Sequence, residues 1–295
     1  MSIQILSQKF FDYSLYIKGY SKQTIKGYRQ AINYLCKFAN VSEIDEVTVE
    51  HVRNFFYYGR TVKNWTPSSF IAFHKALIVF FRYCVTEGYI KINPLEEIEI
   101  PKLERKIPPK LTKQESMRIL EVVDNYPYQA SFLRFRNYAI FATFIFTGLR
   151  KSELLNLKYT DVDIDNRSIF VRQGKGHKDR ILPMNYRLAE ALQKYVEVRK
   201  KAWKTCPEFF ASYTLDMGFR EGGLKKLVDK INASSGIKFG VHKLRHTFAT
   251  LMLEGGCDIY SLSRMMGHSD IKTTTVYLAA SAEHLREQML KHPLN

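Results

Sequence analysis

Five side chains in this sequence are of the types that phosphodiester chemistry requires. Arg150 lies in Thr-Gly-Leu-Arg-Lys-Ser-Glu, His242 and Arg245 lie in His-Lys-Leu-Arg-His, His268 follows Met-Gly, and Tyr277 ends Thr-Thr-Thr-Val-Tyr. Arginine forms bidentate, permanently charged hydrogen bonds with phosphate oxygens. A phenol can act as a nucleophile, and a histidine can move its proton. Together these residues predict a metal-free enzyme in which Tyr277 attacks a phosphodiester.

Each of these residues also has an ordinary interpretation when it is taken alone. Arg150 and Arg245 could be surface charges, and Tyr277 could lie on an amphipathic helix. His242 and Arg245 are three residues apart and therefore share one face of a helix. The neighbouring His246 is expected to point elsewhere, and a structural role suits it equally well. The joint order of the stretches is what favours a functional site.

The composition indicates a folded protein with a polyanionic partner. The 295 residues are 45% hydrophobic and 14% aromatic, which argues against a disordered chain and is enough for two ordinary domains. The formal net charge is +16, of which +3 falls in residues 1–100 and +13 in the remainder. An excess of this size usually serves a nucleic acid, although a merely soluble basic protein would also show it.

Signals of other protein classes are missing from the sequence. The four scattered cysteines have no CxxC spacing, so neither a zinc site nor a disulfide framework is indicated. The first residues lack the basic and apolar regions of a signal peptide. Apolar runs such as Tyr138–Phe146 are shorter than the roughly 18–20 residues that span a bilayer. No Walker motif or carboxylate cluster for Mg²⁺ occurs. We expect a cytoplasmic protein with no membrane partner, metal or cofactor.

Helical periodicity and one proline-rich stretch divide the chain into two domains. Apolar residues recur at helical spacing over residues 3–17 and after caps at Ser21, Thr48 and Thr66, which predicts a four-helix domain over residues 1–98. Residues 99–110 contain three prolines and four basic residues and are expected to form an extended linker.

The second domain, residues 111–295, is expected to combine helices with a small sheet. It opens with a capping box at Thr112. Alternating apolar residues between 162 and 183 predict a small antiparallel sheet, with a glycine-bearing loop between two of its strands. Helices are expected around it, including one over 271–278 and a final one over 282–290. The fold class is therefore mainly α, with a small antiparallel sheet in the second domain.

The order and context of these stretches resemble the tyrosine recombinase (phage integrase) family, and in build its Xer-type members most closely. The likeness spans nearly the whole chain and rests on residues 147–153, 174–180, 242–246, 266–268 and 274–277, with Ser21, Thr24 and Tyr28 in the first domain. It implies an N-terminal core-binding (SAM-like) domain and a C-terminal tyrosine recombinase catalytic domain, which together form a clamp around DNA.

The resemblance also implies catalytic roles for individual residues. Arg150 and Arg245 would hold the scissile phosphate, and Tyr277 would attack it to give a 3′-phosphotyrosyl link and a free 5′-hydroxyl. Lys175 would protonate the departing oxygen, with Lys178 as a rival in the same loop. Because the link keeps the energy of the phosphodiester, rejoining would need neither ATP nor metal.

Histidines and one carboxylate would complete this site. His242 and His268 would serve proton transfer and phosphate positioning, one each. Glu153 resembles the acidic support residue of the family and should orient an active-site histidine or arginine, and His246 is a second support residue. Met266 stands where the family usually has leucine, a change that conserves volume and should have no functional consequence.

The implied partner is double-stranded DNA that carries a specific recombination site. Family members pass a C-terminal helix to a neighbouring protomer. Here that helix would be residues 282–290, and it would link a homo- or hetero-tetramer on two DNA sites. A tail that folds back on its own domain is the alternative. We expect the protein in the cytoplasm, associated with the nucleoid.

Three functions compete at this point. The first is an Xer-like site-specific recombinase, active in chromosome or plasmid dimer resolution or in mobile-element integration and excision. The second is a type IB topoisomerase, which shares the chemistry but relaxes supercoils as a monomer. The third is a catalytically silent DNA-binding relative. The helical first domain and the tail favour the first function, and the complete set of catalytic residue types argues against the third.

Overall fold

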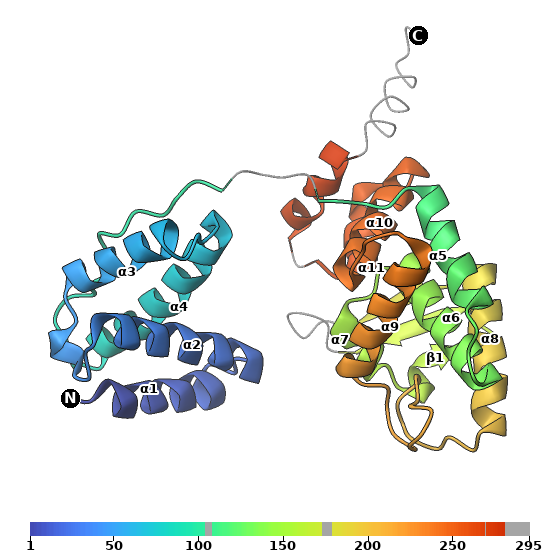
Figure 1. The fold of residues 1–295 in the computed structure, drawn as a ribbon, viewed down its shortest axis with the longest axis horizontal. Helices are drawn as coiled ribbons and strands as arrows, with labels where there is room; N and C mark the ends of the chain where they lie inside the picture. The colour runs from blue at the N-terminus through green and yellow to red at the C-terminus, as the bar shows by residue number, and fades with distance from the viewer. Residues whose placement is uncertain (104–107, 173–178, 269, 281–295) are drawn as a thin grey trace, which may run out of the picture. The chain divides into compact units, whose positions relative to one another are not determined.

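The computed structural model describes residues 1–103, 108–172, 179–268 and 270–280. The chain divides into two compact units, Met1–Arg105 and Lys106–Asn295, shown in Figure 1. The boundary falls inside the proline-rich stretch 99–110, whose described residues lie in neither a helix nor a strand.

The described part of the first unit is built from four α-helices. They are α1 (Ile3–Asp12), α2 (Lys22–Ala39), α3 (Val49–Thr61) and α4 (Pro67–Thr86), with a π-helical turn η1 (Tyr13–Ile17) and a 3₁₀ turn η2 (Ile44–Glu46). Ser21, Thr48 and Thr66 each accept a hydrogen bond from the third backbone N–H of the helix that follows. Such caps contribute about 1 kcal/mol each, and they confirm the predicted helix starts.

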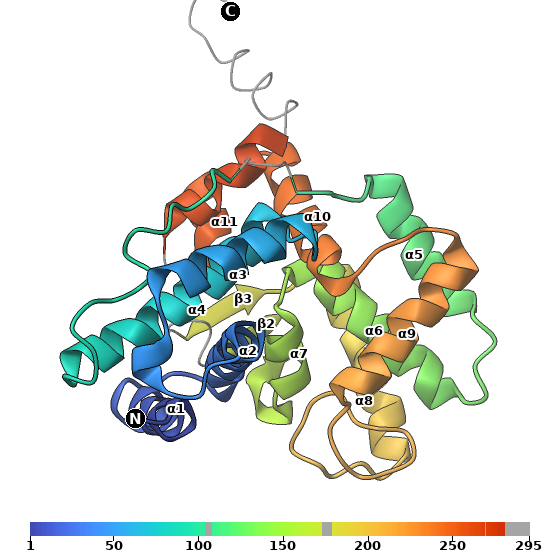
Figure 2. The same cartoon turned by 60° about the vertical axis from the view of Figure 1, so that its left-hand side comes forward.

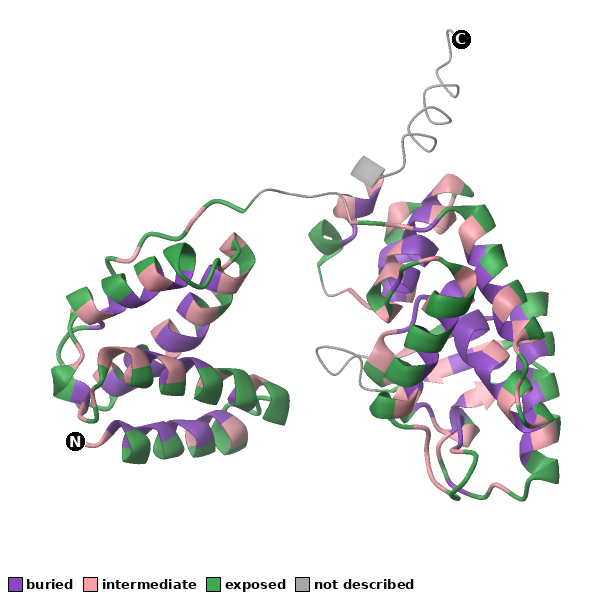
Figure 3. Cartoon of the chain, viewed as in Figure 1, coloured by how far each residue is buried: buried purple, intermediate pink, exposed green. Residues whose placement is uncertain are grey.

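Aromatic side chains fill the core of this first unit. Phe10, Phe55 and Phe80 are fully buried, and the rings of Trp65 and Phe73 stack with centroids 4.2 Å apart. Figure 3 shows the buried residues on the faces by which these helices meet. Among the described residues, α4 is the one helix whose length and composition would allow it to cross a membrane. The core helix of a soluble protein can have the same length and composition. The apolar side chains of α4 pack into this core.

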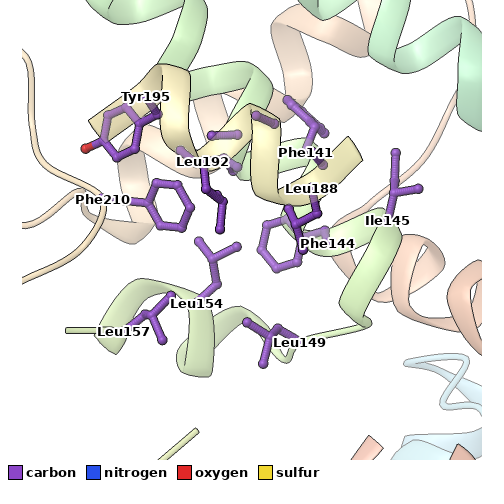
Figure 4. Packing of buried hydrophobic residues seen from close by; sticks show 14 of the residues in the cluster. Phe141, Phe144, Ile145, Leu149, Leu154, Leu157, Leu188, Leu192, Tyr195 and Phe210 are labelled. Carbon is purple, nitrogen blue, oxygen red and sulfur yellow. The ribbon is translucent and has the colours of Figure 1, made fainter. Parts of the chain in front are cut away.

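The second unit packs its helices around α6 (Ser131–Thr147). This helix is apolar on nearly all sides, as a central core helix must be. Figures 1 and 2 show its neighbours, and Figure 4 shows side chains of α6, α7 and α8 that meet in one core, among them Phe141, Phe144, Leu154, Leu188 and Leu192. The other helices are α5 (Lys113–Asn125), α7 (Lys151–Asn156), α8 (Tyr186–Lys201), α9 (Glu221–Ser235), α10 (Val241–Glu254) and α11 (Ile259–Met266).

The predicted antiparallel sheet follows α7 and a 3₁₀ turn, η3 (Tyr159–Asp161). In the described part of the chain it has three strands in sequence order, β1 (Val162–Asp163), β2 (Ser168–Val171) and β3 (Arg180–Pro183). Val171 pairs with Arg180 at one end of the β2–β3 ladder. Ile169 and Leu182 are buried against the helices while Ile181 is exposed, the alternation expected of a sheet with one covered face. The mainly α fold with a small sheet is therefore confirmed.

The prediction of one α-helix over residues 271–278 is wrong. Two short 3₁₀ helices occupy this region, η4 (Ile271–Thr273) and η5 (Thr275–Ala280). The local sequence is a run of β-branched residues, which are poor α-helix formers. Between the two lies Thr274, which is fully buried and hydrogen-bonded through its hydroxyl to His268. The predicted helix over 282–290 falls outside the described residues.

Candidate active site

Two glycine turns in the second unit position the predicted site residues. Gly148 ends α6 with a φ of 61°, and Gly267 ends α11 with a φ of 64°. Glycine adopts this left-handed conformation without steric cost. The first turn places Arg150 at the start of α7, and the second turn is followed at once by His268. A Cβ atom on Gly148 would lie 2.3 Å from the ring of Phe248, so this turn also packs tightly against α10.

One pocket of about 390 Å³ gathers most of the predicted site residues at its wall. Its lining includes Arg150, His242, Arg245, His246, His268 and Tyr277. Stretches that are more than a hundred residues apart in sequence therefore meet at one place. Lys175 and its rival Lys178 lie outside the described residues.

Arg245 is buried and is oriented by the backbone. Its Nη1 donates to the carbonyl oxygen of Gly148 at 2.6 Å, and its Nη2 donates to that of Met266 at 2.7 Å. Burial, with the nearby charge of Arg150, lowers the pKa of Arg245 to about 10. The guanidinium is therefore still charged at neutral pH, and its orientation is set before any anion arrives.

Glu153 joins Arg150 to another arginine, Arg180. Glu153 Oε1 accepts from Arg150 Nη1 at 2.7 Å and from Arg180 Nη1 at 2.9 Å, and Oε2 accepts from Arg180 Nη2 at 2.8 Å. Burial alone would raise the pKa of Glu153, but the hydrogen bonds from Arg180 and Arg150 and the charge of Arg180 outweigh burial and lower that pKa to about 2. The ionised carboxylate of Glu153 contributes one negative charge. Arg150 and Arg180 beside it contribute two positive charges, and the nearby Arg245 contributes another. Among the described residues, the cluster therefore keeps a positive charge that suits an anion.

His268 links the arginine cluster to the segment that carries Tyr277. Arg245 Nη2 lies 3.1 Å from His268 Nε2, and His268 Nδ1 lies 2.8 Å from Thr274 Oγ1. A guanidinium can only donate, so Nε2 accepts and the ring proton sits on Nδ1, which donates to the threonine. The backbone N–H of Tyr277 in turn donates to the carbonyl of Thr274. The orientation of Arg245 and the position of Tyr277 are therefore connected through His268.

The Tyr277 hydroxyl is hydrogen-bonded to His246. The distance from the hydroxyl oxygen to His246 Nδ1 is 2.9 Å. Burial, with the charges of His242 and Arg245, lowers the pKa of His246, so the imidazole is neutral at pH 7 and can accept the phenolic proton. The sequence indicated that His246 points elsewhere, whereas its ring lies against the phenol.

Burial makes the phenol of Tyr277 a weaker acid than a solvent-exposed tyrosine. The side chain is 3% exposed and packs in a small apolar cluster with Phe248, Leu253 and Leu262. Burial raises the pKa of the phenol, and the charges of Arg245 and Arg150 oppose part of that rise. One pocket therefore contains a nucleophilic oxygen, an imidazole that can accept its proton, and two guanidinium groups that can bind an anion.

Arg180 and Thr274 belong to this site, although no sequence pattern singled them out. Arg180 falls within the stretch 174–180, but only its two-pronged contact with Glu153 reveals its place in the cluster. Thr274 is one of three successive threonines, and its burial and its hydrogen bond to His268 distinguish it from the other two. In the part of the chain that the structure describes, no group of three or more His, Cys, Asp and Glu side chains could hold a metal ion.

Two family models match this chain. The phage integrase family matches residues 109–284, and the phage integrase N-terminal SAM-like domain matches residues 6–90. The two matches together span both units and leave only the segment around the proline-rich stretch and the chain ends outside.

Relatives and solved structures agree with these matches. A tyrosine recombinase XerC from Thermodesulfovibrio yellowstonii is 32% identical over 288 residues, which cover 94% of this chain and 93% of the relative. A tyrosine recombinase XerA from Thermococcus onnurineus is 35% identical over 224 residues, 74% of this chain and 72% of the relative. The fold resembles that of the XerH site-specific recombinase in a post-cleavage complex with its difH substrate. The TM-score is 0.76 at 22% identity, over 90% of this chain and 78% of that one.

Proposed function

The chain belongs to the phage integrase family and is an Xer-like site-specific tyrosine recombinase, and from this premise we propose how its residues divide the reaction. Enzymes of this family cleave and rejoin DNA through a tyrosine. We assign that role to Tyr277. The observation that carries the assignment is the hydrogen bond between its hydroxyl and His246, in a pocket that Arg150 and Arg245 also line.

In the first proposed step the Tyr277 oxygen attacks the scissile phosphorus. The new bond to phosphorus forms as the bond to the 5′-oxygen breaks, which leaves a 3′-phosphotyrosyl link and a free 5′-hydroxyl. The phenolic proton passes to His246 Nδ1, and Lys175 supplies a proton to the departing oxygen. In the second step a 5′-hydroxyl of another strand attacks the link, restores the phosphodiester and frees the tyrosine.

Arg150 and Arg245 stabilise the transition state in this proposal. Attack places additional negative charge on the phosphate oxygens, and donors that are already oriented stabilise that charge more than the ground state. Support comes from the carbonyl and carboxylate partners that hold both guanidinium groups. His268 positions the phosphate through its bond to Arg245, and His242 assists the proton transfers from the same pocket.

We propose that the substrate is double-stranded DNA with a specific site, gripped by the two domains as a clamp. The XerH structure is bound to its difH substrate, and the lambda integrase structure is bound to a COC′ core site. In this chain most of the +16 net charge lies beyond residue 100. Contacts with phosphates should dominate the affinity, so binding should weaken steeply with salt. The site of action would be the nucleoid in the cytoplasm.

We further propose a tetramer on two DNA sites, homomeric or with a second recombinase, joined through the C-terminal residues 282–290. This assembly distinguishes a recombinase from a monomeric topoisomerase. It accounts for the exchange of strands between two duplexes, in chromosome or plasmid dimers or in a mobile element.

A plasmid assay tests the proposed function. DNA bound by the Tyr277→Phe variant is sequenced to obtain the site, and two copies of that site are placed on one supercoiled plasmid. We expect deletion or inversion between the copies, in the absence of ATP. Relaxation of plasmids with and without the site, with no rearranged product, would support the type IB topoisomerase instead. Full recombination by a chain that ends at residue 280 would contradict the role of the C-terminal segment.

The role of His246 makes a prediction about pH. His246 accepts a proton only in its neutral form, so the cleavage rate should be highest above its pKa and should fall as the pH drops through it. That pKa is lowered from about 6.5, which places the fall below that pH. In His246→Gln the rate should be lower and this fall should be lost, as measured by single-turnover cleavage between pH 5 and 8. His242 and Arg245 also face this ring. A fall that survives in His246→Gln and vanishes in His242→Gln would assign the base to His242.

A further inference from the structure

Three consecutive backbone carbonyls at the end of α11 accept hydrogen bonds from three different arginines. The pairs are Met265 O with Arg180 Nε at 2.7 Å, Met266 O with Arg245 Nη2 at 2.7 Å, and Gly267 O with Arg150 Nη2 at 2.8 Å. The turn 265–267 is therefore a common support for both proposed phosphate-binding arginines. Arg180, the third donor, has no role in the proposed mechanism.

All three nitrogen atoms of the Arg180 guanidinium donate hydrogen bonds to this support or to Glu153. Its Nη1 and Nη2 form a two-pronged contact with Glu153, whose oxygens also receive Arg150. The Arg180 side chain is 9% exposed and that of Glu153 is 6% exposed. A fork of this geometry fixes both partners, which a single point charge would not do.

The Arg180 guanidinium also packs directly against the turn itself. A Cβ atom on Gly267 would lie 2.8 Å from Arg180 Nη1 and 3.0 Å from its Cζ. The turn therefore requires glycine for two reasons, its left-handed φ and the close approach of this arginine. Any shift of Arg180 would be transmitted to the carbonyls of Met266 and Gly267, because the interior is tightly packed.

We propose that Arg180 is a positioning residue that sets the geometry of both phosphate-binding arginines. It acts on Arg150 through Glu153, and on Arg150 and Arg245 together through the turn 265–267. It also opens β3, at the end of the connection that contains Lys175, so the same anchor fixes where that connection returns to the sheet. This inference rests on the roles proposed above for Arg150 and Arg245.

Arg180→Lys separates positioning from binding, because lysine keeps the charge and loses the fork. Misplaced arginines should slow single-turnover cleavage by about 10- to 100-fold, while the Kd for site DNA, which many phosphate contacts determine, changes by less than about 2-fold. The matched control is Arg199→Lys. Arg199 is also buried and donates to backbone carbonyls, but these are the carbonyls of Lys204, Cys206 and Glu208, which lie outside Glu153 and the turn 265–267. Arg199→Lys should lower the melting temperature of the protein and leave the cleavage rate unchanged. If Arg180→Lys does not fold, Arg180→Gln takes its place.

A double-mutant cycle tests whether Arg180 acts through its neighbour. If it does, Arg150→Lys and Arg180→Lys should be clearly less than multiplicative in their effects on the cleavage rate, because both disturb one network. Multiplicative effects, a wild-type rate in Arg180→Lys, or a parallel loss of rate and affinity would overturn the inference. Wild-type cleavage by Arg150→Lys would instead overturn the proposed role of Arg150, so the two failures are distinguishable.

Discussion

Tyr277→Phe is expected to abolish covalent attachment to DNA while it leaves DNA binding intact. The change removes one oxygen and keeps the ring in its apolar cluster with Phe248, Leu253 and Leu262. The lost hydrogen bond to His246 should cost about 1 kcal/mol of stability, which a folded domain tolerates. Without its nucleophile the enzyme should lose at least about 10⁴-fold in cleavage rate, which is the order of loss found when the nucleophilic residue of a covalent enzyme is removed.

The measurement uses a nicked duplex that carries the site, on which the cleaved strand cannot be rejoined. Wild-type protein should accumulate an adduct that survives SDS, and Tyr277→Phe should form none. Tyr260→Phe is the matched control, because Tyr260 is an exposed tyrosine on the neighbouring helix α11. It should form the adduct at the wild-type rate. An adduct that persists in Tyr277→Phe would remove Tyr277 from the mechanism.

Arg245→Lys should reduce the cleavage rate by about 10²- to 10³-fold, the effect of removing one oriented donor from a transition-state anion. Arg245 is held by two carbonyls at fixed distances, and lysine cannot satisfy both while it also reaches a phosphate. The positive charge stays, so DNA affinity should change by less than about 3-fold, consistent with many phosphate contacts sharing the binding energy.

Single-turnover cleavage and equilibrium DNA binding separate these two quantities. Arg134→Lys is the control, because Arg134 forms a partly exposed ion pair with Asp124 at the surface of the second unit and such pairs contribute little. It should leave both quantities unchanged. A loss of DNA affinity in Arg245→Lys as large as its loss of cleavage rate would show that Arg245 serves binding and not the transition state.

Local sequence rules predicted most of the fold because they act within a few residues. The caps at Ser21, Thr48 and Thr66 set helix starts through short-range hydrogen bonds, and the capping box at Thr112 does the same for α5. The same rules failed at residues 271–278, where amphipathic spacing predicted an α-helix. There the β-branched residues disfavour an α-helix, and a hydrogen bond between His268 and Thr274 fixes the break between two 3₁₀ helices. Apolar spacing alone indicates neither effect.

The site shows the same division between local and tertiary information. The spacing of His242 and Arg245 on one helix face could be read directly, since it depends only on helix geometry. The contact of His246 with Tyr277 joins α10 to η5 across 31 residues, and the contact of Arg180 with Glu153 joins β3 to α7. Neither contact follows from periodicity, because each depends on how separate elements pack.

The identity of the residue that carries the DNA tests the central proposal most directly. Wild-type protein is trapped on the nicked duplex, digested with protease and nuclease, and the modified peptide is sequenced by mass spectrometry. We predict one nucleotide 3′-phosphate on the Tyr277 oxygen, with a free 5′-hydroxyl on the released strand. A phosphate on any other residue, or a 5′-phosphate linkage, would contradict it.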